Sequence, residues 1–517
     1  MPTRLTFALL ATLLGSTAAI AGPFADGGDR QLRQDVDLLK ADGLIRGPVD
    51  SWPLPWVQIN GGLDAARDGR KLDPYIDAAV RRLERLSDLA AQQTSVDARI
   101  DATSGTAVAR DFGDAARANV DASVRGELNF GALSVDAGVG ARSYRSGQRL
   151  NFEPSQVVVT IGNFGLYGGY TETWFGPGHD GALLYSNSAR PFPRIGIKKL
   201  MPTAIDLPVV RWLGPIRLDF FVGILDGKRD FRTSANIGTR ISFQPAKGLE
   251  IGLNRAQQLC GQGRPCGFHQ ISQSFIGFGN SDNPTSGRQD DYVRQPGNQI
   301  AGYDVSYTRR FGRIAAKFYF EVEAEDAQHI LIEQYGRQIG TTLSGPWGHR
   351  GASWQAYVEY ADTFAAQLFN GTPLSKAFAS EFKYPGSLYN NNLYLDGFTY
   401  KGRPIGYWTD GDSHNLVGSL SVTDTRNRRW YASVRSVHLN ITGISGVATG
   451  PYGLYSGTIG NRISPDPEKF GIGTVGSEWP TRFGDVRIEA RYQTDSPGTP
   501  GQRVGRAQIE VGLRQRF

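Results

Sequence analysis

The sequence lacks long apolar runs. After its first 21 residues no stretch of about 20 apolar residues occurs, so we expect no transmembrane helix in the exported chain. It also lacks long linkers, low-complexity tracts and blocks of like charge, which favours one large architecture over several separate domains. The formal net charge is only +6 over 517 residues, and the basic residues are scattered along the chain. Nucleic acid is therefore not an expected partner.

Cysteine is scarce as well. The two cysteines, Cys260 and Cys266, lie in "CGQGRPC", a segment in which Gly and Pro favour a turn. In an exported chain, this spacing predicts a disulfide across a small loop. A zinc site needs a third and a fourth ligand, which the pair lacks, so we expect neither a bound metal nor a cofactor.

The N-terminus has the pattern of an export signal. Arg4 is followed by an apolar run from Leu5 to Leu14 and by a small-residue triplet that ends at Ala21. This pattern predicts a secretory signal peptide over residues 1–21. The apolar run is too short to span a bilayer, and we expect the mature protein to leave the cytoplasm.

Residues 22–105 are predicted to form a small helical unit. Asp29 can cap a helix in "RQLRQDVDLLKAD", where apolar residues recur at i, i+4 and i+7, and Gly43 can end it. A second helix is predicted to begin at Asp73-Pro74, because Pro suits the first turn and an apolar face follows. Between them, "GPVDSWPLPW" alternates Trp with Pro and is predicted to be extended.

Residues 106–517 are predicted to be all β. From about Val120 the apolar period changes to two, in segments such as "IAAKFYFEVEAE", "RRWYASVRSVHL" and "GRAQIEVGLRQRF". In a soluble sandwich the polar face of such strands would meet solvent, and in a transmembrane barrel it would line a wet lumen. The amphipathic last strand ends in Phe517, as in bacterial outer-membrane barrels, and this favours the barrel.

The length of this part sets the size of the barrel. About 400 residues give roughly 16 to 20 antiparallel strands, and strand side chains alone cannot fill so wide a lumen. The turn-rich segments 275–299 and 369–415 are predicted to be extracellular loops, some folding over or into the barrel. The helical unit can plug the periplasmic end. Without such fillings the barrel would be an open pore.

The segment "TWFGPGHDGALLYSNSARPFPR" (173–194) has the residue types of a catalytic site but not the spacing. His179 and Asp180 are adjacent, and no G-x-S-x-G elbow surrounds its serines. The Gly-Pro-Gly break and the two X-Pro steps instead predict a strand that turns into a lumen and places Asp180, Asn187 and Arg190 among polar partners.

Two other groups of residues carry side chains of the types that bind metals or act in catalysis. Asp410 and Asp412 have D-x-D spacing, but the rest of a calcium loop is missing, so a loop that bonds across a lumen is favoured. His349 and His414 lie near Ser, Asp and Asn, which leaves an outer-membrane hydrolase conceivable. No spacing singles out a catalytic dyad, so we predict no enzyme and no catalytic residue.

Aromatic and planar polar side chains gather between residues 384 and 412, which is the chemistry that sugar rings and hydroxyls need. The alternative is that these aromatics form the interfacial girdle of a barrel. The predicted ligand-binding residues, taken together with the earlier segment, are Trp174, Asp180, Asn187, Arg190, Tyr389, Asn391, Tyr394, Arg403, Tyr407, Trp408, Asp410 and Asp412.

The chain resembles the Wzi-type capsule assembly proteins of Gram-negative outer membranes. The resemblance rests on four blocks in order: "DVDLLKADGLIRGPVDSWPLPW", "WFGPGHDGALLYSNSARPFP", "NRAQQLCGQGRPC" and "YKGRPIGYWTDGDSHNL". The positions that match in the second and fourth blocks are Trp174, Gly176, Pro177, Gly178, Asp180, Asn187, Ala189, Arg190, Pro191, Arg403, Gly406, Asp410 and Asp412. The cysteine pair is not part of the family pattern, and variation is expected at His179.

The resemblance implies an 18-stranded outer-membrane barrel closed by a periplasmic helical bundle and by loops. It implies a lectin that attaches capsular or related polysaccharide to the cell surface and is neither an enzyme nor an open channel. We therefore expect three partners, namely the polysaccharide, outer-membrane lipid and the barrel insertion machinery. The competing function is a porin or polysaccharide-export channel.

Overall fold

The structure is a computed structural model that describes residues 22–69, 71–144, 147–264, 266–268, 271–272, 297–325, 335–365, 388–391, 394–449, 456–499 and 505–517. The predicted signal peptide lies outside these residues. So do residues 275–296, 369–387 and 392–393 of the two predicted loops.

Three helices follow the start of the described chain. They are α2 (Arg30–Ala41), α3 (Trp56–Arg67) and α4 (Pro74–Ala90). Asp29 caps α2 as predicted, accepting a hydrogen bond from the Leu32 amide at 2.9 Å. Asp73 precedes α4, but its carboxylate forms an ion pair with Arg310 of the barrel instead of capping the helix. The sequence did not predict α3, which follows the Trp/Pro segment directly.

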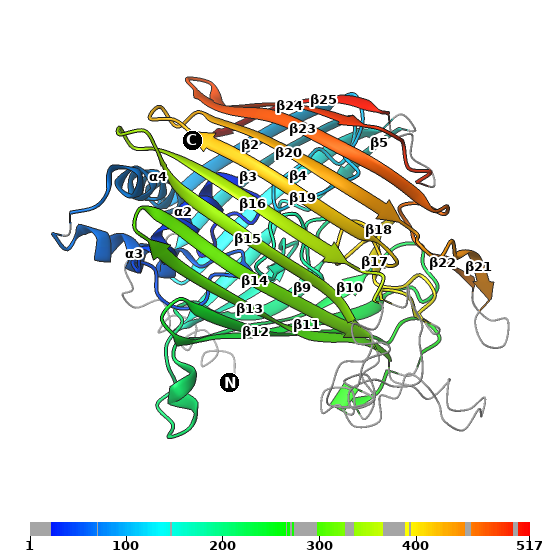
Figure 1. Cartoon of the computed structure of the whole chain (residues 1–517). Coiled ribbons are helices and arrows are strands. Elements are labelled where there is room, and N and C mark those ends of the chain that lie inside the picture. Colours follow the sequence, from blue (N-terminus) through cyan, green and yellow to red (C-terminus); the bar gives the residue numbers. More distant parts are fainter. Residues whose placement is uncertain are drawn as a thin grey trace, which may run out of the picture.

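The wall of the molecule is a closed ring of antiparallel strands with eighteen positions (Figure 1). At one position β5 and β6 share the place beside β4. The ring closes where β2 pairs with β25. The wall strands in chain order are β2 (Thr94–Thr103), β3 (Val120–Phe130), β4 (Leu133–Tyr144), β5 (Gly147–Asn151), β6 (Gln156–Ile161), β7 (Phe164–Gly169), β9 (Arg194–Lys199), β10 (Ile216–Leu225), β11 (Ser234–Ala246), β12 (Leu249–Leu259), β13 (Gly297–Phe311), β14 (Ile314–Glu325), β15 (Tyr335–Trp347), β16 (Ala352–Asp362), β19 (His414–Thr423), β20 (Arg429–Leu439), β23 (Glu468–Thr481), β24 (Gly484–Gln493) and β25 (Ala507–Arg516).

The predicted all-β barrel of about 18 strands is confirmed, and one domain boundary moves. The helical part ends at Ala90, and the first wall strand begins at Thr94. The predicted boundary at residue 105 is therefore too late by the length of β2. The alternation of apolar and polar residues in β2 is weak, because two of its outward positions, Ala98 and Ala102, carry only a methyl group.

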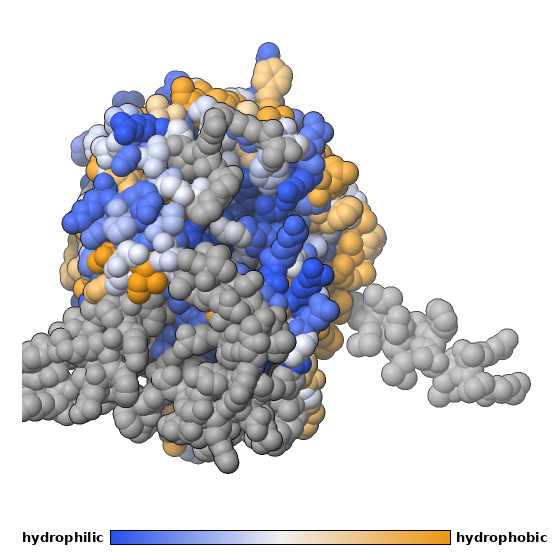
Figure 2. All heavy atoms as spheres, turned by 90° about the vertical axis from the view of Figure 1, so that its right-hand side faces the viewer, coloured by the Kyte–Doolittle hydropathy of each residue, from blue (hydrophilic) through white to orange (hydrophobic). Residues whose placement is uncertain are grey.

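The alternation of side chains assigns the two faces of the wall. In β25 the outward residues Ile509 and Val511 are 59% and 46% exposed, whereas the inward Gln508 and Glu510 are 3% and 0% exposed. An apolar outer face and a polar inner face are the pattern of strands that face lipid outside and a wet or filled lumen inside. Figure 2 looks onto the end away from the helices, where hydrophilic residues gather within the rim and hydrophobic residues lie on the flanks.

Within the described residues, no helix has the length and apolar character needed to cross a membrane.

The two ends of the barrel differ. The helices lie at one end, which we call the helix end, and the long connections lie at the other, which we call the loop end (Figure 1). Short two-stranded pairings lie outside the wall ladder. They are β1 (Ser51–Trp52) with β8 (Trp174–Phe175), β17 (Thr399–Tyr400) with β18 (Arg403–Pro404), and β21 (Ser445–Thr449) with β22 (Ser456–Gly460).

The lumen is filled by inward-folded chain. Two apolar clusters occupy it, one around Trp52 and Trp174 beside the helices and one around Phe175, Tyr185 and Trp408. The pairing of β1 with β8 joins the helical part to the 170–193 segment inside the barrel. The wide ring that the strand count predicts is thus packed with protein, as a barrel of this diameter requires if it is not an open pore.

Candidate functional site

Asp180 lies at the centre of a buried polar cluster in the lumen. Its carboxylate accepts hydrogen bonds from Trp408 Nε1 at 3.0 Å, Asn415 Nδ2 at 2.7 Å and Arg435 Nε at 2.8 Å. Asp180 and Trp408 are both 0% exposed. The cluster joins the 170–193 segment to the chain before β19 and to the wall. Because Arg435 neutralises Asp180, the buried charge is tolerated.

Carboxylates of the wall hold the same segment by its backbone. Glu359 on β16 accepts from the amides of His179 at 2.7 Å and Asp180 at 3.1 Å. Glu321 on β14 accepts from the Leu183 amide at 2.8 Å. A segment inside a barrel has no sheet partner for most of its amides, so these side chains satisfy groups that would otherwise be buried without a hydrogen bond.

The remaining predicted residues of segment 173–194 divide into buried and partly exposed ones. Trp174 is 1% exposed and packs edge-on against Phe112, with ring centroids 5.1 Å apart. Asn187 donates to the Phe112 carbonyl at 2.7 Å. The Arg190 side chain keeps 20% of its surface exposed and faces Glu153 at 3.6 Å.

The predicted residues Tyr389, Arg403 and Tyr407 are also interior. The Tyr389 hydroxyl donates to the Leu183 carbonyl and accepts from the Tyr407 amide at 3.1 Å, and both tyrosines are 0% exposed. Arg403 is 9% exposed and donates to the Val108 carbonyl at 2.6 Å. These side chains fasten inner segments to one another, and they do not form the girdle that the sequence left as an alternative.

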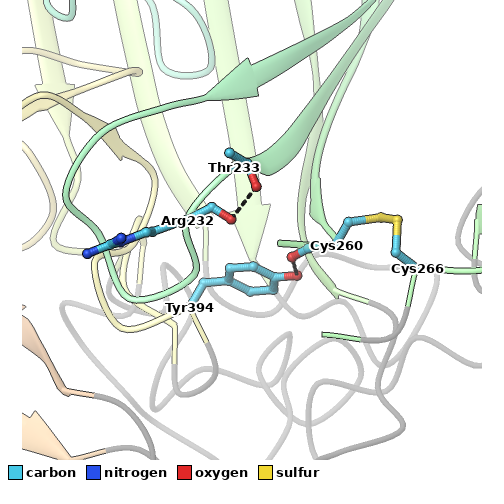
Figure 3. Close-up of a disulfide and its surroundings, with 5 residues drawn as sticks. All are labelled: Arg232, Thr233, Cys260, Cys266 and Tyr394. Atoms are coloured by element: carbon cyan, nitrogen blue, oxygen red, sulfur yellow. Dashed lines mark hydrogen bonds between the residues drawn. A yellow bond between two sulfur atoms is a disulfide. The ribbon is translucent and has the colours of Figure 1, made fainter. Parts of the chain in front are cut away.

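The structure contains the Cys260–Cys266 disulfide, at the loop end just after β12 (Figure 3). The Tyr394 hydroxyl donates to the Cys260 carbonyl at 2.9 Å, and the Tyr394 ring packs edge-on against Phe231. The half-buried Asn391 accepts from the Tyr394 amide at 2.9 Å. The disulfide loop is thereby joined to the connection between β16 and β19.

The D-x-D pair serves as a set of backbone acceptors. Asp410 accepts from the Arg462 amide at 2.7 Å and Asp412 from the Thr442 amide at 3.0 Å. Burial raises the pKa of the Asp410 carboxyl. Across the described ranges, no group of three or more His, Cys, Asp and Glu side chains is placed to hold a metal ion. The two carboxylates point to different loop segments and do not converge on one ion.

The histidines considered for catalysis do not meet. His349 lies in the turn before β16 at the helix end, and His414 begins β19 opposite Asp362 at the loop end of β16. The eleven residues of β16 separate them by about 30 Å. His179 is stacked on Tyr357 with ring centroids 4.9 Å apart, and burial lowers its pKa well below the usual range. His349 and His414 therefore do not form a pair, and the carboxylate beside His414 is that of Asp362, with Nε2 and Oδ1 3.4 Å apart.

A charged cavity, which the sequence did not predict, lies beside β2, β3 and β4. Its volume is about 220 Å³. Burial, and Asp114 nearby, raise the pKa of Glu172 to about 7. In the sequence, charged residues at every second position of β2 and β3 indicate a face that points into the lumen. They do not indicate that part of the lumen beside this face stays unfilled. Charged residues in its lining include Asp97, Arg99, Arg117, Arg125, Glu153 and Glu172.

These observations define a class of protein: a transmembrane β-barrel whose lumen is occluded by helices at one end and by inward-folded connections along its length. The chain belongs to the family of the capsule assembly protein Wzi, whose model matches residues 90–457. The family resemblance seen in the sequence is thereby confirmed.

The chain is similar to one curated protein and to several solved structures. A Klebsiella pneumoniae protein described as an uncharacterized 55.8 kDa protein in the cps region is 25% identical over 443 residues, which are 84% of this chain and 81% of that protein. Among solved structures, Escherichia coli Wzi, described as an outer membrane protein involved in group 1 capsule assembly and a carbohydrate-binding β-barrel, superposes with a TM-score of 0.76 at 18% identity. The match covers 96% of this chain and 99% of that one. Pseudomonas aeruginosa OprD matches with a TM-score of 0.42 at 9% identity, over 82% of this chain and 94% of its own.

Proposed function

We propose that this chain is a lectin-like barrel of the outer membrane that binds an exported polysaccharide, capsular or related, and anchors it at the cell surface. Carbohydrate binding is the described property of E. coli Wzi, and the shared family brings it to this chain as a proposal. The proposed orientation in the outer membrane places the helical unit toward the periplasm and the loop end toward the outside of the cell. Outer-membrane lipid and the barrel insertion machinery are the other partners expected of such a barrel.

The observation that carries the proposal is the cluster at Asp180. It locks the 170–193 segment to Trp408 and Arg435 inside the ring, so the lumen is packed where a porin would be open. The loop end is then the face left for a polymer too large to enter. A long polymer that meets many copies of the protein gains affinity by repeated attachment, even if each contact is weak.

The predicted ligand-binding residues take two roles under this proposal. The ten that are at most 9% exposed, such as Asp180, Tyr389 and Trp408, hold the inner segments and the loop end in shape. Arg190 and Asn391 keep part of their surface exposed and are the members of the set proposed to contact sugar. Hydrogen bonds from a guanidinium and an amide suit hydroxyl and carboxylate groups of a glycan.

The test is to delete the gene and to measure polysaccharide that is cell-bound and released. We expect total polysaccharide to stay constant while the cell-bound share falls. Returning the gene should restore the cell-bound share. An unchanged partition would overturn the anchoring function. Arg190→Ala with Asn391→Ala should lower the cell-bound share, whereas Asp64→Ala, an exposed change on α3 at the other end, should not.

A channel and an enzyme are the competing functions. Purified protein in planar bilayers is expected to show no stable large conductance, since the charged cavity is only about 220 Å³. A persistent large conductance would favour a porin or an export channel. No hydrolase activity is expected, so replacing His349 or His414 by Ala should leave polysaccharide length unchanged.

A further inference from the structure

The connection between β9 and β10, residues 200–215, is an apolar projection at the helix end. Its sequence is "LMPTAIDLPVVRWLGP". Every residue from Thr203 to Val209 is exposed, and a single 3₁₀ turn (Val210–Leu213) follows. Val209 is 81% exposed and Trp212 is 76% exposed, far more than is usual for apolar side chains of this size. In Figure 1 the projection leaves the lower left of the barrel and points away from the helices.

The base of the projection is firmly attached, so its position is set by the wall. Lys199 Nζ donates to the Thr203 carbonyl at 2.9 Å, and the Gln244 amide of β11 donates to the Pro215 carbonyl at 3.1 Å. The tip between these points has no cover from the described part of the chain. Because Val209 and Trp212 are three residues apart around a 3₁₀ turn, they lie on one side of it.

Exposed aromatic side chains surround the barrel at this same end. Each lies at the helix-end terminus of its strand or in the adjacent turn, and such a ring is the interfacial girdle of a membrane barrel. The strands β9 and β10, which flank the projection, have no exposed aromatic at this level. The girdle residues are Phe130, Phe164, Phe311, Trp347, Trp430, Trp479, Phe483 and Phe517.

Cationic side chains accompany the girdle. The guanidinium carbons of Arg309 and Arg482 lie 5.7 Å and 4.5 Å from the ring centroids of Phe311 and Phe483. Arg211, in the projection, is exposed and next to Trp212. An aromatic that carries a neighbouring cation fits the boundary between acyl chains and anionic headgroups.

We propose that residues 203–213 form a membrane-binding foot that inserts Val209 and Trp212 into the lipid headgroup boundary at the helix end and holds Arg211 against anionic phospholipid. The foot lies in the sector from β9 to β12, whose strands carry no exposed aromatic at this level. The occupant is lipid, because the projection is continuous with the lipid-facing wall and points away from the helical bundle. The foot does not depend on polysaccharide binding.

The test uses full-length protein with Val209→Cys as its single free thiol, since Cys260 and Cys266 are joined. The thiol carries an environment-sensitive fluorophore, and the protein is reconstituted into vesicles of phosphatidylcholine with or without phosphatidylglycerol. We expect a shift of emission to shorter wavelength, strong quenching by lipids with a doxyl group near the headgroup, and a larger effect with phosphatidylglycerol. Trp212→Asp in the same chain should remove about half of the quenching or more.

Asp64→Cys, on the exposed side of α3 at the same end, is the matched control and should report water in both vesicles. A Val209→Cys signal equal to this control would overturn the foot and leave the projection as a docking surface for a protein. Equal quenching with and without phosphatidylglycerol would retain insertion and overturn the role of Arg211. The foot meets a lipid leaflet in either orientation of the barrel in the vesicle. A mixture of orientations therefore does not change the expected quenching.

Discussion

Asp180 accepts a hydrogen bond from the indole of Trp408 at 3.0 Å, across 228 residues of sequence and inside a closed ring. Each residue belongs to a separate block of the family resemblance, and the bond joins the two blocks inside the barrel. One supplies the carboxylate and the other the donor, and Arg435 from the wall balances the charge. The lumen filling is therefore a single interlocked unit.

Asp180→Asn is predicted to destabilise this unit by about 3–5 kcal/mol, because Arg435 would lose its main partner in a dry interior. Thermal unfolding in detergent should show a lower midpoint, and planar bilayers should show new, unstable conductance as inner segments loosen. The control is Asp495→Asn, which weakens an ion pair of two exposed side chains with Arg506. Exposed pairs contribute about 0–1 kcal/mol, so equal effects of the two changes would contradict the interlocked lumen.

Gly181→Ala should destabilise by about 1–3 kcal/mol through overpacking. A Cβ at this position would lie 2.3 Å from the ring of Tyr407, which is itself fully buried. Gly418→Ala is the matched change, since a Cβ there meets no atom within 4 Å. The unfolding midpoint should fall only for the first variant, and a neutral Gly181→Ala would show that the Tyr407 ring can move aside.

Glu172 predicts a pH dependence. Its pKa is raised from 4.5 to about 7 by burial and by Asp114. The folded protein therefore holds a proton that the unfolded chain releases, and stability falls as pH rises from about 4.5 to 7. Glu172→Gln should remove this decline and be more stable than the parent by about 1–3 kcal/mol at pH 8, with little difference at pH 4.

The measurement is the difference in unfolding midpoint between parent and variant across this pH range. Glu84→Gln, which alters a surface pair with Arg67, is the control and should follow the parent. A difference curve for Glu172→Gln that is flat from pH 4 to 8 would show that folding leaves the pKa of Glu172 near its ordinary value.

Replacing both Cys260 and Cys266 by Ser should lower the local stability of the loop end by about 2 kcal/mol, because the closed loop is short. Amide exchange of residues 260–266 should speed up while the wall strands keep their protection. The parent treated with a reductant should behave like the double variant. Faster exchange throughout β12 would mean that the disulfide supports the wall as well as the loop.

The wall could be predicted from sequence where its alternation is strong. "IAAKFYFEVEAE" coincides with β14 at Ile314–Glu325, because large apolar and charged residues alternate without interruption. β19 was not predicted, since in "HNLVGSLSVT" Gly418 takes an outward position and Val417 an inward one, which lowers the contrast between the faces. Its first two residues were assigned to the preceding loop.

The sequence indicated that chain segments fold into the lumen, but it did not indicate which residues they contact there. The Gly-Pro-Gly break and the X-Pro steps indicated that residues 173–194 leave the wall and need polar partners. No local pattern could assign Glu359 to the amides of His179 and Asp180, because that pairing depends on the curvature of the whole ring. For the same reason the sequence could group Tyr389 and Trp408 as sugar-binding candidates without indicating that both are buried.

The pairing of β2 with β25 has a consequence for assembly. Val96 and Phe517 exchange two backbone hydrogen bonds, at 2.9 Å and 3.0 Å, so the last residue of the sequence completes a seam with the strand that directly follows the helices. Until β2 and β25 pair, the sheet is open and has two unpaired edges. Closure of the seam encloses the inner segments, which the same chain supplies between its wall strands. Removal of the final ten residues would take away the ladders of β25 with both β2 and β24, and would leave those two strands as unpaired edges of an open sheet.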